Sequence, residues 1–202
     1  MIEGGISTCP GVSCTDDGHW TTGYLFFKNF LSDLGRTETH GGHINFHSSL
    51  LFNMALTFSG VTYLLFYSFL KNIFPNQLLA TLGSLLGICG AISFIGVAFT
   101  PADLYLEAHI IANEWIFRFF LASTIIYSWL IYKNASIDNK YLIGNLIFII
   151  SLFSYILILI YGPKPHEPGG LEFQAVAQKF IMFNFFLSIV LQTMAYDKIM
   201  SQ

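Results

Sequence analysis

The stretch LIGNLIFIISLFSYILILIY, residues 142–161, decides the fold class of this chain. Its twenty positions contain no charged side chain, and a helix of about 20 apolar residues crosses the roughly 30 Å hydrocarbon core of a bilayer. The strand of a membrane barrel is about half as long and alternates polar with apolar residues. The stretch therefore predicts a transmembrane helix.

Four further apolar runs of similar length accompany this one. They cover residues 48–70, 77–100, 109–132 and 175–196, and polar or proline-containing segments separate them. Because backbone groups in lipid are satisfied only within helices or closed barrels, we expect an all-α, polytopic bundle of five transmembrane helices. Residues 48–202 form this domain. Residues 1–47 form an N-terminal segment outside the cytoplasm, with a short helix or re-entrant turn near residues 24–34.

The composition of the whole chain agrees with this prediction. Of the 202 residues, 54% are hydrophobic and 10% are charged, whereas soluble domains have about 25% charged residues. The nine basic residues are scattered, whereas nucleic-acid-binding proteins carry a basic patch. The composition argues against a soluble enzyme, a disordered chain and any nucleic-acid partner.

The charged residues between the spans predict the orientation. One side of the membrane holds the 71–76 and 133–140 loops and the C-terminus, with four lysines and two acids. The other side holds the N-terminal segment and the 100–108 and 162–174 loops, with three basic residues and nine acids. Because cytoplasmic loops carry the excess of lysine and arginine, we expect the C-terminus in the cytoplasm and the N-terminus outside, in a cell inner or plasma membrane.

Two cysteines, Cys9 and Cys14, lie close together in the segment predicted to be outside. Disulfides persist in such oxidising surroundings, so a small disulfide loop is the favoured interpretation. Two free thiols and a metal-binding pair are the alternatives. The metal interpretation is weaker because the sequence has no second cysteine pair.

Histidines are concentrated just before the first span. His40, His43 and His47 would share one face if this segment is helical, although two intervening glycines argue against a helix. Three imidazoles on one face are suitable ligands for a divalent transition metal such as zinc. His109 would join them if the first and third helices are neighbours. The alternatives are a polar helix cap, haem ligation or a pH sensor.

Three acidic residues on the same side, Asp33, Asp103 and Glu107, are candidate catalytic groups. A carboxylate of this kind would act as the base for a metal-bound water. Structural roles are the alternative interpretation. Asp103 would cap the third helix and Glu107 would lie in its first turn, where negative charge is favoured. Asp33 would lie in a surface turn that ends at Gly35.

Two opposite charges, Glu114 and Arg118, lie inside the third span and are four residues apart. Side chains at this spacing are neighbours on a helix, and charges within a span usually face the bundle interior. We expect a buried ion pair that orients the bundle, and the alternative is the floor of a polar cavity. Lys179, near the outer end of the fifth span, is expected to snorkel or to reach Glu167 or Glu172.

Three short motifs lie between residue 32 and residue 179. The first is Ser32-Asp33-Leu34-Gly35 with Asn53 in the following span, the second is Phe99-Thr100-Pro101-Ala102-Asp103 with His109, and the third is Leu171-Glu172-Phe173 leading to Lys179. Together they resemble a prokaryotic family of polytopic membrane proteins of unknown function (DUF998-like). The resemblance covers the chain from Asp33 onward, and it implies a helical membrane fold without any known activity. The family pattern has one more helix before the first motif, and the lack of that helix here fits an N-terminus outside.

Two functions of different classes fit these features. The first is a small non-catalytic bundle, or an accessory subunit of a larger membrane complex, with an outward-facing polar site; its partners are membrane lipids and other membrane subunits. The alternative is a metal-dependent membrane enzyme that acts on a lipid-like substrate at the outer face. A proton-coupled carrier is a third hypothesis, which the lack of an inverted repeat disfavours. The sequence contains no nucleophile elbow, phosphate loop or HExxH motif.

Overall fold

Five long helices confirm the prediction of an all-α membrane bundle. The structure, a computed structural model, describes residues 24–74, 76–134 and 140–200. The helices are α1 (Phe46–Leu70), α2 (Gln77–Phe99), α3 (Leu106–Lys133), α4 (Lys140–Tyr161) and α5 (Gly170–Met200), with two short 3-10 helices, η1 (Leu31–Gly35) and η2 (Lys71–Ile73). Each of the five is long and apolar enough to cross a membrane. Even α4, with 22 residues, extends about 33 Å at 1.5 Å per residue.

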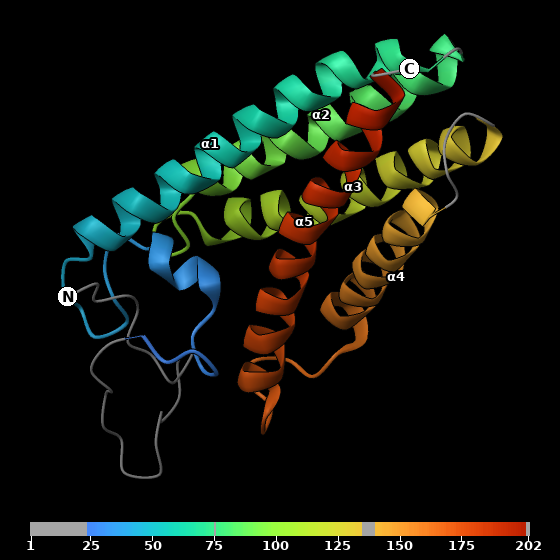
Figure 1. Cartoon of the computed structure of the whole chain (residues 1–202). Coiled ribbons are helices and arrows are strands. Elements are labelled where there is room, and N and C mark those ends of the chain that lie inside the picture. Colours follow the sequence, from blue (N-terminus) through green and yellow to red (C-terminus); the bar gives the residue numbers. More distant parts are fainter. Residues whose placement is uncertain (1–23, 75, 135–139, 201–202) are drawn as a thin grey trace.

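The helices pack in an order that follows the chain. Helix α2 lies between α1 and α3, and α4 packs against both α3 and α5 (Figure 1). Small residues let α2 approach its neighbours closely. A Cβ atom on Gly83 would lie 3.0 Å from the Tyr127 ring of α3, and one on Gly87 would overlap the Tyr67 ring of α1.

Aromatic rings fill the centre of the bundle, around Phe185 of α5. This side chain is 2% exposed. Its ring lies 5.0 Å from that of Phe148, 5.2 Å from Phe120 and 5.7 Å from Phe94, measured between ring centroids. All three contacts are edge-to-face, an arrangement that the charge distribution of aromatic rings favours. Phe185 thus contacts side chains of α2, α3 and α4, although the α5 backbone packs mainly against α4.

Hydroxyl groups make the buried hydrogen bonds between α1, α2 and α3. The Ser84 Oγ atom lies 2.6 Å from the carbonyl oxygen of Tyr67 and 2.6 Å from the Tyr127 hydroxyl. Ser123 donates to the carbonyl oxygen of Gly83 at 2.8 Å. Because these bonds are shielded from water in the middle of the bundle, they help to fix how the three helices lie against one another.

Residues 24–45 fold back onto the end of the bundle that holds the α2–α3 and α4–α5 loops (Figure 1). The short helix or turn expected near residues 24–34 is a turn followed by η1. The end of η1 lies directly against α1, because a Cβ on Gly35 would lie 2.6 Å from the Phe52 ring and 2.9 Å from Asn53 Oδ1. The Asn53 side chain donates to the Gly35 carbonyl oxygen at 3.4 Å. Two residues of the first sequence motif therefore meet in space.

Candidate functional site

A cavity of about 530 Å³ lies at this end of the bundle, between the N-terminal segment and helices α3, α4 and α5. Such a volume is typical of small-ligand sites. Its charged and polar lining residues are Lys28, Ser32, Asp33, Arg36, His40, His109, Asn113, Glu114, Lys164, Gln174 and Gln178. Its apolar and aromatic lining includes Phe30, Ala102, Leu106, Ile110, Tyr155, Leu159, Pro165 and Leu171. The cavity reaches Glu114, which lies about 12 Å along α3 from Leu106 at 1.5 Å per residue.

Asp33 belongs to the polar wall of the cavity, and only 8% of it is exposed. The surface turn expected from the sequence is therefore wrong. Its carboxylate accepts hydrogen bonds from the Phe30 backbone N–H at 2.9 Å and from the Asn29 side chain at 3.4 Å. His40 Nε2 lies 3.3 Å from its other oxygen. Burial, together with the nearby Asp33 carboxylate, raises the pKa of the Tyr24 hydroxyl above its usual value.

The four candidate histidines divide into two pairs. His40 and His109 both line the cavity. His109 is buried, with its Nδ1 atom 2.7 Å from the Thr100 carbonyl oxygen. His43 and His47 are exposed and are not part of the cavity wall. His109 was expected to lie beside His47, but it shares the cavity with His40 instead.

The expected helical face of His40, His43 and His47 does not form, because α1 begins only at Phe46. The preceding residues make a turn in which Gly42 has a φ of +78°, a conformation that glycine adopts without strain. Within residues 24–74, 76–134 and 140–200, no group of three or more His, Cys, Asp or Glu is arranged to hold a metal ion. The predicted zinc site thus gains no support from the geometry.

Asp103 anchors the N-terminal segment to the α2–α3 loop. Its carboxylate accepts hydrogen bonds from the Thr37 backbone N–H, the Thr37 hydroxyl and the Glu38 backbone N–H. Partial burial alone would raise the pKa of Asp103, but these hydrogen bonds outweigh it and hold that pKa below its usual value. The expected helix-capping role is wrong, since Tyr105 occupies the N-cap position of α3 without a side-chain bond. Glu107 lies exposed in the first turn of α3, as its structural interpretation predicts.

Glu114 and Arg118 form an ion pair, with 2.7 Å between the Glu114 Oε2 and Arg118 Nη1 atoms. The pair is not buried as expected, because the side chains are 36% and 35% exposed. Glu114 lines the cavity, and the Arg118 guanidinium lies 5.4 Å from the centre of the Trp115 ring. Both interpretations of the sequence therefore apply in part. Glu114 and Arg118 form an ion pair, and Glu114 also lines a polar cavity.

Lys179 makes a contact that the sequence did not indicate. Its ammonium group donates to the carbonyl oxygen of Asn29 and lies over the rings of Tyr24 and Phe26. The expected acids bind other groups. Glu172 lies 4.0 Å from the Lys28 ammonium, and the Glu167 carboxylate accepts from the Lys164 backbone N–H.

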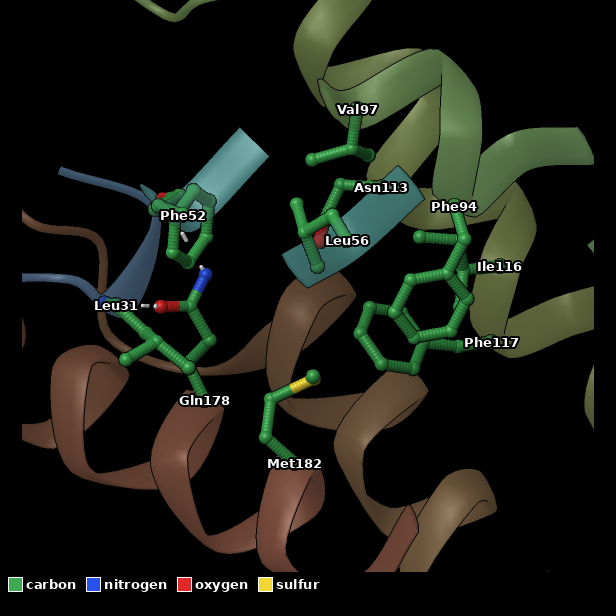
Figure 2. A pocket seen from close by; sticks show the side chains of 11 residues that line it. Leu31, Phe52, Leu56, Phe94, Val97, Asn113, Ile116, Phe117, Gln178 and Met182 are labelled. Carbon is green, nitrogen blue, oxygen red and sulfur yellow. Dashed lines mark hydrogen bonds between the residues drawn. The ribbon is translucent and has the colours of Figure 1, made fainter. Parts of the chain in front are cut away.

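A second, smaller cavity of about 30 Å³ lies deeper in the bundle (Figure 2). It shares Ser32, Asn113 and Gln178 with the large cavity, and its volume is enough for a water molecule. Gln178 accepts a hydrogen bond from the Leu31 backbone N–H at 2.6 Å, which Figure 2 shows near the ring of Phe52. Gln174 and Gln178 were not predicted as site residues from the sequence, although their spacing of four residues places both on one face of α5.

Cys9 and Cys14 lie outside the described residues. No family model matches the chain, and neither a curated protein nor a solved structure was found to be similar to it. The resemblance to the DUF998-like family therefore stays a prediction.

Proposed function

We propose that this chain is a non-catalytic membrane protein that binds a lipid-like amphiphile in the cavity of about 530 Å³. The observation that carries the proposal is that the cavity wall combines charged and apolar side chains. Charged groups such as Lys28 and Arg36 come from the N-terminal segment, and the helices add the apolar Leu106, Ile110 and Leu159 beside polar residues such as Asn113 and Gln178. An amphiphile has the same two parts, a polar head and an apolar chain.

The state of the acidic residues favours binding over catalysis. The Asp33 carboxylate receives donors on both of its oxygens, and the Asp103 carboxylate accepts from three donors of the N-terminal segment. Hydrogen bonds to an ionised carboxylate stabilise its charged form and so make it a weaker base. The alternative of a metal-dependent enzyme has no supporting arrangement in the part of the chain that the structure describes.

The location in the cell belongs to the same proposal. The charge distribution favours a cytoplasmic C-terminus and a cavity that opens toward the outer leaflet of an inner or plasma membrane. Exposed apolar side chains along α1, such as Phe58 and Leu65, suit contact with membrane lipids or with further subunits of a membrane complex.

Native mass spectrometry of the full chain, purified in a mild detergent, tests the proposal. The wild-type protein is expected to retain one amphiphile per chain after the surrounding lipids are removed. Ile110→Trp places a larger side chain in the cavity wall and is expected to lose this molecule. Ile125→Trp, at an equally exposed position of the same helix outside the cavity, is the matched control and is expected to keep it. Equal retention in both variants would contradict the proposal.

A further inference from the structure

The charges that line the cavity are not balanced. Its two carboxylates, Asp33 and Glu114, are both engaged by neighbours, His40 at 3.3 Å and Arg118 at 2.7 Å. Three further basic residues, Lys28, Arg36 and Lys164, line the same cavity. The cavity therefore offers positive charge to a ligand.

Arg36 is held in position with part of its guanidinium unused. Its Nε–H donates to the Glu38 carbonyl oxygen at 3.1 Å. Its own backbone is fixed on both sides, because its N–H donates to the Asp33 carbonyl oxygen and its carbonyl oxygen accepts from the Asn45 side chain at 3.0 Å. Within the described residues, its two terminal nitrogens have no hydrogen-bond partner. A guanidinium of this kind suits two parallel hydrogen bonds to a phosphate.

Both lysines keep hydrogen-bond donors that are able to add to such a contact. Lys28 lies 4.0 Å from Glu172, with 43% of its side chain exposed, and an exposed pair of this kind contributes little. The Lys164 ammonium donates to the carbonyl oxygens of Leu159 and Ile160 at the end of α4. An ammonium has three donors, so one remains for a ligand.

Resting on the proposed function, we infer that the amphiphile carries a phosphate group in its head, which Arg36 binds with help from Lys28 and Lys164. The apolar wall formed by Leu106 and Ile110 then takes the acyl chain. A neutral amphiphile would leave the free donors of Arg36 and Lys164 without an anionic partner.

Calorimetric titration of the full chain in detergent tests this inference with three probes. Dihexanoyl phosphatidic acid carries phosphate and short acyl chains, dihexanoylglycerol carries the chains alone, and inorganic phosphate carries the anion alone. The phospholipid is expected to bind about tenfold or more tightly than dihexanoylglycerol, because charge-assisted hydrogen bonds are made only to the former. Inorganic phosphate is expected to bind more weakly than the phospholipid, since it lacks the chains.

Variants assign the effect to named residues. Arg36→Gln is expected to lower the affinity for the phospholipid about tenfold without changing that for dihexanoylglycerol, and Arg36→Lys is expected to restore part of the loss. Lys28→Gln is expected to cost about threefold. Lys71→Gln, at the opposite end of the bundle, is the control and is expected to have no effect. If Arg36→Gln fails to fold, Lys28→Gln and the three wild-type titrations still test whether the cavity binds the phosphate group.

The outcomes separate the two proposals. Equal affinity for the phospholipid and dihexanoylglycerol, with both abolished by Ile110→Trp, would overturn the phosphate inference and leave the amphiphile site standing. Inorganic phosphate binding as tightly as the phospholipid would also overturn the inference. If neither lipid binds to the wild-type protein, the proposed function itself fails.

Discussion

The substitution Asp103→Asn tests how the N-terminal segment is held over the cavity. The carboxylate of Asp103 accepts hydrogen bonds from the Thr37 backbone N–H, the Thr37 hydroxyl and the Glu38 backbone N–H. An asparagine at this position offers one carbonyl oxygen and replaces the other oxygen with an NH₂ donor. All three donors reach the Oδ2 atom of Asp103, so an asparagine oxygen in that place is a single, uncharged acceptor for them, and the NH₂ group takes the place of the Oδ1 atom that faces the Thr37 N–H.

The expected cost follows from the number and kind of these bonds. A hydrogen bond to a charged acceptor contributes about 1.5–3 kcal/mol. Because Asp103 is half-buried, water replaces part of the lost interaction. We expect a loss of about 2 kcal/mol, which corresponds to a roughly 30-fold increase in local opening of the segment around Thr37.

Hydrogen–deuterium exchange in detergent measures this opening. The amides of Thr37 and Glu38 are expected to exchange about 30-fold faster in Asp103→Asn, while amides in the middle of α2 and α3 keep their protection. Glu107→Gln removes the same charge from an exposed carboxylate close by and serves as the control. The reasoning is refuted if Asp103→Asn leaves both amides protected, or if Glu107→Gln accelerates them equally.

Three further perturbations address the core, the ion pair and the pH dependence. Phe185→Ala is expected to lower the free energy of unfolding by about 3–5 kcal/mol and Tm by about 10 °C. Phe186→Ala, at a 59% exposed position, is the control and is expected to shift Tm by about 2 °C or less. Equal shifts in the two variants would contradict the role of Phe185 in the aromatic core. Arg118→Gln leaves Glu114 without its partner inside the span and is expected to cost about 1–3 kcal/mol in chemical unfolding, most of which the double variant with Glu114→Gln recovers. Because the pKa of Asp103 is lower in the folded state, the stability that Asp103 gives to the segment around Thr37 is fully present above about pH 5 and is lost as the pH falls below about 4. The Thr37 amide is therefore expected to exchange faster in acid in the wild-type protein, and the same acid dependence in Asp103→Asn would disprove this.

The transmembrane helices were predictable because a single physical requirement defines them. A run such as residues 142–161 must satisfy its backbone within lipid, so its length and lack of charge are enough to identify it. The starts of α3 and α5 were placed too late, at residues 109 and 175, since their first turns lie at the membrane surface and include Glu107 and Glu172. Composition carries no information on where a helix continues into polar surroundings.

The cavity was only partly predictable, because its residues come together through tertiary contacts. The sequence indicated Asp33, His40 and His109 on one side of the membrane, and all three line the cavity. It did not indicate that Asp103 would bind the backbone of Thr37, 66 residues earlier in the chain. Nor did it indicate that Arg36 would line a cavity. Such roles depend on where the N-terminal segment folds back, which no local pattern encodes.

Photocrosslinking in nanodiscs tests the central claim, that the cavity binds an amphiphile, most directly. The full chain would be reconstituted with a phospholipid that carries a photoreactive group on its acyl chain, and the labelled residues mapped by mass spectrometry. We expect labelling of Leu106, Ile110 and Leu159 that an excess of unlabelled phospholipid competes away, whereas labelling of Leu65 and Phe69 on the exposed face of α1 is expected to fall only in proportion to dilution. If all five positions respond to the competitor in the same way, the cavity is ordinary lipid-facing surface and the proposed function is wrong.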